Sequence, residues 1–403
     1  MSSEILAVQG GPAFDESIIQ YEYHTHAPYA STRYGNNDEI RIPIQQQDVF
    51  TLPAESFLHI EGKLTNATTV NLVNNAMAFL FEEIRYEVAG VEVDRTKNVG
   101  ITSTVKTWLS FNQNDAKRLI NAGWVAPTND KLSVDTSTGE FNFCVPLKML
   151  LGFAEDYTRI IMNVKQELIL LRTSNDLNAM VKATGEPVGK LELVKVHWKM
   201  PYVRVSNTYR LPLLNHMERD SPLVMPFRSW ELHEYPVLPT TDRQTWTVKT
   251  SSELEKPRYV VLMFQTARKN DLTKNASEFD HCDLTNVRLF LNDKYYPYDN
   301  LNQNISKNRF ALFYDMYTRF QNSYYRRHDS GSLLSPDQFK SKAPLFVIDC
   351  SRQDESLKSA AVDIRLEFES SGNFPANTTA YVLIIHDTIV QYKPLSNTVH
   401  QVT

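Results

Sequence analysis

The chain has 403 residues, of which 42% are hydrophobic, 22% charged and 11% aromatic, and its formal net charge at pH 7 is −5. This length suits two domains of roughly 200 residues, and the many Phe and Tyr residues favour β-strands. A small net charge without a run of like charges excludes a basic arm that would neutralise phosphates, so direct packaging of nucleic acid by this chain is not expected.

Three cysteines, Cys144, Cys282 and Cys350, are too few and too far apart for a disulfide framework or a Cys-x-x-Cys zinc site. We therefore expect the protein to fold in a reducing compartment. The first residues, MSSEILAVQGG, lack the basic start and apolar core of a secretory signal. No run of about 18 apolar residues predicts a membrane-spanning helix.

Residues 1–37 are polar, are interrupted by Gly and Pro, and show little periodicity. This pattern predicts an extended arm that a neighbouring subunit orders. The apolar anchors of the arm would be Ile18, Ile19, Tyr21 and Tyr23.

Beyond residue 37, one pattern of strands occurs twice. Residues 84–86 (IRY) fall on 287–289 (VRL), an offset of 203 residues, and both precede a turn. Three further matches follow in the same order: 57–62 with 260–265 and 143–145 with 346–348 at the same offset, and 164–168 with 364–368 at an offset of 200.

Each half also carries a helical insertion at the same point, at residues 100–111 and 310–320. Long polar loops follow at 121–140 and 321–343, and we expect both at one end of the molecule on its outer surface. Trp108 and Phe310 are expected to pack beneath these loops.

The duplication predicts an all-β fold, a double jelly roll made of two tandem eight-stranded β-sandwiches with short helical insertions. The expected division, in chain order, is an N-terminal arm (1–37), a first jelly roll (38–200), a linker (201–221), a second jelly roll (222–395) and a C-terminal tail (396–403).

Three segments resemble the major capsid proteins of double jelly-roll DNA viruses. The stretch 143–156, FCVPLKMLLGFAED, is similar to the "VPL" strand and loop of that family, and 287–292 leads into 310–320 like the family's strand that enters a helix after an "LNG"-like turn. The stretch 377–392, NTTAYVLIIHDTIVQY, is similar to the last strand. The resemblance spans roughly residues 40–395, is nearest to the Polinton or adintovirus type, and extends distantly to adenovirus hexon.

This resemblance implies a structural protein, not an enzyme, whose trimers form pseudo-hexagonal capsomers of an icosahedral shell. The implied location is the virion, assembled in the host nucleus or cytoplasm. The implied partners are further copies of the chain, neighbouring capsomers and penton or minor capsid proteins, without sequence-specific nucleic acid, while an inner membrane stays open.

Two other function classes remain. A tandem β-sandwich that binds carbohydrate or mediates adhesion would usually be secreted, which the absence of a signal and of a disulfide pattern disfavours. A jelly-roll enzyme needs a catalytic cluster, and none is evident.

Two short motifs could suggest a metal or a nucleophile. His24-Thr25-His26 has the His-x-His spacing of cupins, but no glutamate follows within residues 27–33, so a surface position is the better interpretation. The run 280–283 (DHCD) resembles a fragment of a metal or cysteine-nucleophile site, yet without partners at ligand spacing it predicts a turn.

The remaining candidates also favour structural interpretations. Glu82 and Glu83 are adjacent on a strand and point to opposite faces, so they cannot form a hydrolytic pair. For Glu92 and Asp94, a position at a solvated strand edge is the better interpretation. The run 324–327 (YYRR) could stack on bases but is typical of an interface loop. Glycosylation of the sequons stays open at Asn66, Asn275, Asn304 and Asn377. We predict no catalytic, cofactor or metal residue.

Overall fold

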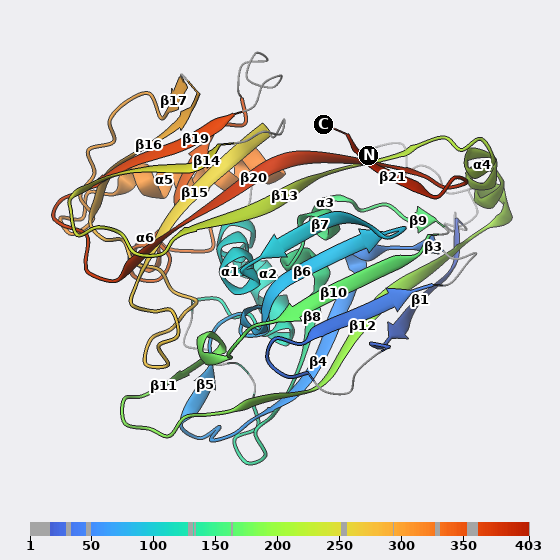
Figure 1. Ribbon diagram of the computed structural model, residues 1–403, viewed down its shortest axis with the longest axis horizontal. Helices are drawn as coiled ribbons and strands as arrows, with labels where there is room; N and C mark the ends of the chain where they lie inside the picture. Colours follow the sequence, from blue (N-terminus) through green and yellow to red (C-terminus); the bar gives the residue numbers. More distant parts are fainter. Residues whose placement is uncertain are drawn as a thin grey trace, which may run out of the picture.

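The computed structural model describes residues 17–29, 34–45, 50–127, 132, 134–162, 164–250, 256–292, 294–326, 331–352 and 362–402. Figure 1 shows two β-rich units side by side, the first coloured blue to green and the second yellow to red. Among the described residues, no helix combines the length and apolar character needed to cross a bilayer.

The first unit consists mainly of two antiparallel sheets. One has the order β8-β4-β12-β3-β9, with β1 on the other edge of β12, and the second has the order β2-β10-β6-β7. The strands of this unit are β1 (Ile18–His26), β2 (Glu39–Ile44), β3 (Phe50–Thr51), β4 (Phe57–Leu64), β5 (Val70–Leu72), β6 (Phe81–Val88), β7 (Val91–Lys97), β8 (Glu140–Pro146), β9 (Ile161–Met162), β10 (Gln166–Arg172), β11 (Met180–Lys182) and β12 (Leu191–Val205).

The second unit repeats this arrangement. Its sheets have the orders β13-β20-β15-β18, with β21 also paired to β20, and β14-β19-β16-β17. The strands are β13 (Leu223–Tyr235), β14 (Arg243–Thr250), β15 (Lys256–Thr266), β16 (Leu284–Leu291), β17 (Lys294–Tyr296), β18 (Phe346–Asp349), β19 (Asp363–Ser370), β20 (Thr378–Lys393) and β21 (Thr398–Val402).

The helices are short and lie mainly in the connections. The α-helices are α1 (Val99–Ser110), α2 (Gln113–Leu119), α3 (Gly152–Asp156), α4 (Asn207–Glu218), α5 (Ala311–Tyr325) and α6 (Pro336–Ser341). The 3-10 turns are η1 (Pro53–Glu55), η2 (Ala78–Leu80), η3 (Ile120–Ala122), η4 (Leu147–Met149) and η5 (Leu177–Ala179).

Eight strands of one unit correspond to eight strands of the other in position and chain order. The sheet β2-β10-β6-β7 matches β14-β19-β16-β17, and the path β1-β12-β4-β8 matches β13-β20-β15-β18. The two strands that carry the strongest sequence match, β6 and β16, therefore hold the same place in their sheets. This one-to-one correspondence is the double jelly-roll order expected from the repeat.

The offset of 203 residues is correct for β6 and β16 but not for the whole chain. Leu168 lies opposite Tyr86 as Leu366 lies opposite Leu289, so Leu168 matches Leu366 and not Phe368. The offset also matches Glu61, which is partly exposed, with Phe264, which is buried and whose ring faces that of Phe368 in the opposite sheet. A slip of one residue exchanges the faces of a strand. The match of residues 57–62 with 260–265, which places a partly exposed side chain on a buried one, was therefore wrong.

The prediction of an arm at residues 1–37 was wrong for Ile18–His26. These residues form β1, which pairs antiparallel with residues 198–205 of β12 in the same chain, and Glu39–Ile44 forms β2. The alternation of apolar and polar residues from Ile19 to His24 was an available strand signal, but the Gly and Pro residues on either side led to the prediction of an arm. Residues 1–16 of the expected arm lie outside the described residues.

The predicted linker and tail also contain regular structure. Strand β12 continues to Val205 and α4 occupies Asn207–Glu218 within the expected linker 201–221. In the expected tail, Thr398–Val402 forms β21, which pairs with β20.

The two helical insertions are present as α1 and α5, but the regions after them are less polar and less exposed than predicted. Trp124 is fully buried against Trp108, and Phe339 of α6 is buried against Phe310, so both predicted aromatic anchors do pack beneath these segments. Gln338 Nε2 donates to the Pro127 carbonyl at 3.0 Å, which places the two segments at the same end of the molecule.

Strand β1 gives a first testable prediction. Deletion of residues 1–28 removes the pairing partner of β12 and the His24 ring that stacks on Tyr202 at 4.1 Å between centroids. We expect the melting temperature to fall by roughly 5–10 °C in differential scanning fluorimetry. Deletion of residues 1–16 is the control and should melt like the full chain. Equal melting of both deletions and the full chain would contradict the assignment of β1 to the first sheet.

Candidate functional site

Two charged residues that are buried, Asp94 and Lys106, lie at the junction between the two units, together with the partly buried Glu155, Asp156 and Arg228. Helix α3 and strand β7 of the first unit pack against β13 of the second, and α1 packs against α5. In Figure 1, β13 runs beside β7 and α3. The junction is thus formed by segments that are far apart in the chain.

Helix α1 is buried on all sides because it lies between the two units. Every residue from Val99 to Ser110 is buried. A Cβ atom at Gly100 would come within 2.2 Å of the Phe79 ring, so a glycine is needed for the helix to lie on η2. The hydroxyl of Thr107 accepts a hydrogen bond from Trp124 Nε1 at 2.9 Å, which shows how the buried polar groups of α1 are satisfied.

Lys106 of α1 is the most deeply buried cation at the junction, with 2% of the residue exposed. Its ammonium group donates to Glu155 Oε1 at 2.7 Å and to Tyr325 Oη at 2.8 Å, and it also lies 4.3 Å from the centre of the Tyr324 ring. Burial lowers the pKa of Lys106, and the carboxylate of Glu155 offsets part of that effect. A buried ion pair of this kind is costly to break because one charge is then left without its partner.

A second ion pair joins Arg228 of β13 to Asp156 at the end of α3. The guanidinium donates to both carboxylate oxygens, at 2.7 Å from Nε and 2.6 Å from Nη2, and the Arg228 backbone amide donates to the same carboxylate at 2.9 Å. Nη1 donates to the Tyr324 carbonyl, and the guanidinium lies 3.4 Å from the centre of the Tyr324 ring. Burial would lower the pKa of Arg228, but the hydrogen bonds to Asp156 and the nearby Tyr324, Asp156 and Glu155 charges together raise it above its ordinary value. Bidentate geometry of this type fixes orientation as well as distance.

The two units approach each other closely at Gly152. A Cβ atom there would come within 2.0 Å of the Arg228 carbonyl oxygen, so only glycine lets α3 reach β13. The next residue, Phe153, packs its ring edge-to-face against Phe227 at 5.3 Å.

Asp94 holds α3 in place from β7. Its carboxylate is buried and accepts hydrogen bonds from the backbone amides of Phe153, at 2.8 Å, and Arg95, at 2.9 Å. Burial raises the pKa of Asp94 to about 6, although the two amide donors oppose the shift. Asp94 is therefore a structural residue of the junction. It does not form a hydrolytic pair with Glu92.

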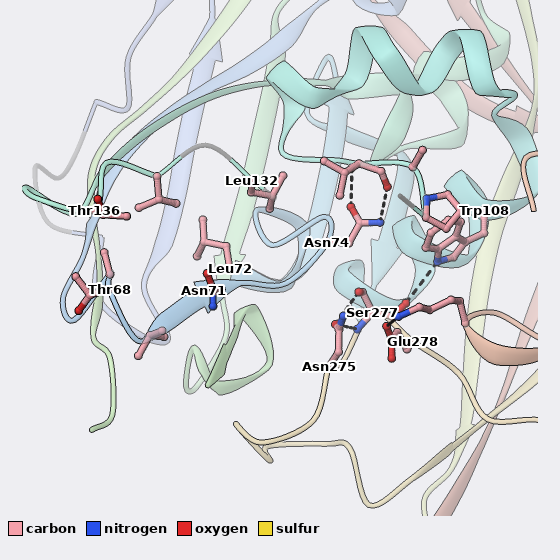
Figure 2. Close-up of a pocket in the computed structure, with 17 residues that line it drawn as sticks. Thr68, Asn71, Leu72, Asn74, Trp108, Leu132, Thr136, Asn275, Ser277 and Glu278 are labelled. Atoms are coloured by element: carbon pink, nitrogen blue, oxygen red, sulfur yellow. Dashed lines mark hydrogen bonds and ion pairs between the residues drawn. The ribbon is translucent and has the colours of Figure 1, made fainter. Parts of the chain in front are cut away.

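A cavity of about 530 Å³ lies beside the junction and is lined by residues of both units (Figure 2). Trp108 Nε1 points to the Ser277 carbonyl at 3.4 Å, and Asn275 Oδ1 accepts from the amide and hydroxyl of Ser277. Asn74, also in the lining, exchanges two hydrogen bonds with the backbone of Val125. These polar groups bond to the protein itself, so the cavity has the character of a gap between packed units.

The two histidines of the His-x-His motif make contacts with Tyr202 and lie at the protein surface or partly buried on β1. His24 stacks on Tyr202, and His26 Nε2 lies 3.0 Å from the Tyr202 hydroxyl. Burial, and then the nearby His24, lower the pKa of His26 to about 4. Within the part of the chain that the structure describes, no three His, Cys, Asp or Glu side chains are placed to hold a metal ion.

The run 280–283 forms a turn, as the sequence favoured. Asp280 is engaged by the Arg268 guanidinium at 2.7 Å, and His281 Nδ1 accepts from the Asp283 amide at 3.0 Å. Burial raises the pKa of the Cys282 thiol to about 12, which is the opposite of what a nucleophilic cysteine requires.

The other candidates occupy structural positions. Glu83 pairs with Arg85, and Glu92 with Arg95. Tyr324 and Tyr325 of the 324–327 run are the junction residues described above, which agrees with an interface, while Arg327 lies outside the described residues. Glycosylation of the sequons stays open, and the Asn275 side chain accepts a hydrogen bond from the Ser277 amide.

Sequence reasoning missed Lys106, Glu155, Asp156 and Arg228. Glu155 and Asp156 end the stretch 143–156 that resembles the capsid proteins, but nothing in that stretch indicates their partners, because the pairs join positions that only the fold brings together. One signal was available: Lys106 is the only charged residue in the otherwise apolar and small-residue stretch 99–110.

Comparison with known proteins assigns the family. The sequence profile described as the double jelly roll-like domain matches residues 70–390, and the chain therefore belongs to that family. A search of curated protein sequences finds no match to the chain.

Three solved structures are similar over nearly the full chain. The structure of VP54 of PBCV-1, fitted into a reconstruction of the virophage Sputnik, has 10% identity and a TM-score of 0.61 and covers 98% of this chain and 99% of that one. The Sputnik virophage structure has 9% identity and a TM-score of 0.61, covering 99% and 91%. The Faustovirus major capsid protein has 9% identity and a TM-score of 0.59, covering 96% and 92%. The predicted fold class and the resemblance to this group are thus confirmed.

The close approach at Gly152 gives a second prediction. Gly152→Ala should push α3 from β13 and lower the free energy of unfolding by about 1–3 kcal/mol, measured by chemical denaturation. Gly372→Ala is the matched control, because a Cβ atom there meets no atom within 4 Å. Equal stability of the two variants would contradict the contact at the junction.

The ion pair between Lys106 and Glu155 gives a third prediction. Lys106→Met leaves the Glu155 carboxylate without its cation and should cost about 3–5 kcal/mol of unfolding free energy. The double variant with Glu155→Gln should cost less than the sum of the single variants, by more than about 1 kcal/mol in a double-mutant cycle. Additive losses would mean that the two side chains do not interact.

Asp94 gives a prediction about pH. Because its pKa is raised to about 6 in the folded protein, the folded state binds the proton more tightly than the unfolded chain. Its contribution to stability is therefore fully present below pH 4 and is lost as the pH rises to about 6. The variant Asp94→Asn should gain stability relative to the parent chain between pH 4 and pH 7, on the order of 2–3 kcal/mol. A stability difference independent of pH would contradict the shifted pKa.

Proposed function

We propose that this protein is the structural major capsid protein of an icosahedral virus or virus-like element, and that it assembles through homotrimeric capsomers. The observation that carries the proposal is the similarity over 98% of this chain and 99% of the VP54 chain, with both jelly rolls joined in one polypeptide. Proteins named as major capsid proteins, including that of Faustovirus, share this arrangement.

The physical properties of the chain support a structural role. Two similar units joined by buried ion pairs form one rigid block, and three such blocks present six similar units around an axis. A hexagonal outline of this kind can tile a curved shell with repeated contacts. On this proposal the protein lies in the virion, is assembled inside the host cell, and contacts other capsomers and penton or minor capsid proteins.

Mass in solution tests the proposal. Sedimentation velocity of the purified chain should show a species of three times the chain mass or larger particles, which negative-stain microscopy would resolve as shells or capsomers. A stable monomer at high protein concentration would contradict a capsomer. Binding of that monomer to a glycan array would instead support a carbohydrate-binding module.

A further inference from the structure

Four of the ten histidines of the chain lie in one sheet, the sheet that contains β1, β4 and β12. His24 and His26 are on β1, His59 is on β4 and His197 is on β12. Histidine is the side chain whose ordinary pKa puts its change of charge close to neutral pH. The first sheet therefore concentrates groups that respond to mild acid.

Strand β1 is the part of this sheet that is least firmly held. It lies at the edge of the sheet beside β12 (Figure 1), and among the described strands β12 is its only partner. The side chains of β1 are half-exposed or exposed. A segment with little buried surface opens at a lower free energy than the centre of a sheet. A change of charge on β1 can therefore release this strand without unfolding the rest of the unit.

Both histidines of β1 contact one side chain of β12, Tyr202. The His24 ring stacks on the Tyr202 ring, with 4.1 Å between centroids and 16° between planes. His26 Nε2 lies 3.0 Å from the Tyr202 hydroxyl, and the two ring centroids are 5.7 Å apart. Tyr202 thus connects the C-terminal half of β1 to the sheet.

The arrangement around Tyr202 favours an uncharged His26. Burial, and then the nearby His24, lower the pKa of His26 to about 4. The Tyr202 hydroxyl keeps its proton because burial raises its pKa to about 12. A neutral imidazole can accept a hydrogen bond from that hydroxyl, whereas a protonated ring has only donors.

Few charges around the two histidines could compensate a proton on His26. Glu22 of β1 lies 3.7 Å from His24 Nε2, and its side chain is 56% exposed. Arg204 of β12 lies on the same face and adds a positive charge. On β2, which also contacts β1, Arg41 and Glu39 pair with each other at 2.6 Å.

The opposite face of β1 contains no histidine. There Lys199 Nζ of β12 donates to the Thr25 hydroxyl at 2.5 Å, and the Tyr23 hydroxyl donates to the Glu55 carbonyl at 3.4 Å. Lysine, threonine and tyrosine side chains keep their protons throughout the range in which histidine titrates. Any response of β1 to mild acid therefore comes from the face that contacts Tyr202.

We propose that β1 is an acid-released strand, which stays paired with β12 at neutral pH and detaches from it in mild acid when His26 takes up a proton. The direction follows from linkage, since the paired form binds that proton less tightly than the detached form, in which the pKa of His26 returns to 6.5. Release is thus favoured progressively as the pH falls from 6.5 to about 4. The inference goes beyond the proposed structural function and applies to the chain whether or not it assembles.

Hydrogen exchange of the full chain at pH 7 and pH 5, corrected for the intrinsic exchange rate at each pH, tests the proposal. The protection of residues 18–26 and of residues 198–205, which pair with them, should fall by about tenfold or more at pH 5. Residues 259–264 of β15, which are all buried in the second unit, are the internal reference and should change by less than about twofold. Equal changes in β1 and in the reference would overturn the proposal.

The variant His26→Gln identifies the responsible group, because glutamine is polar but does not titrate. At pH 5 this variant should retain most of the protection that it has at pH 7. His400→Gln on β21 is the matched control and should lose protection in β1 as the parent chain does. A loss in His26→Gln as large as that of the parent chain would overturn the proposal, since other groups would then cause the release.

A second variant keeps the test decisive if glutamine itself weakens β1 at pH 7. His26→Phe retains a ring that can pack against Tyr202 but cannot be charged. It should keep β1 protected at both pH values. A fall in protection of this variant at pH 5 equal to that of the parent chain would overturn the proposal as well.

Discussion

The fixed orientation of the two units depends on charges that are buried between them. Lys106 and Arg228 each lose hydration at the junction, and each is compensated by a carboxylate of α3 and by the ring of Tyr324. Because a buried charge is stable only with its partner in the correct geometry, these pairs specify one relative arrangement more strongly than apolar contact alone could. Glycine at position 152 permits the short distance, and Asp94 holds the helix that carries both carboxylates.

Duplication explains why one chain contains both sides of an interface. Each unit has an outermost strand, β1 or β13, and a surface formed by its helical insertion and the strand before it. Within the chain, β13 of the second unit meets the surface of the first unit, and α3 adds to this contact. The two units of one polypeptide are thereby joined through a strand of one and the helices and a strand of the other.

The sequence predicted the fold class, the repeat and the helical insertions, because these depend on patterns within short windows. The alternation in β6 and β16 identifies buried faces directly, and Trp108 and Phe310 were correctly expected to be buried. The alternation in residues 19–24 marks a strand, but not its pairing with β12, and nothing local marks the pairing of Lys106 with Glu155. Both pairings join segments that are distant in the chain, for which no local pattern exists.

Cryo-electron microscopy of the assembled protein tests most directly the claim that buried ion pairs hold the two units in one orientation within a capsid subunit. We expect capsomers of three chains, each with density for Lys106 against Glu155 and for Arg228 against Asp156 between its two units. A reconstruction in which the two units of a chain do not meet through these pairs would contradict this claim.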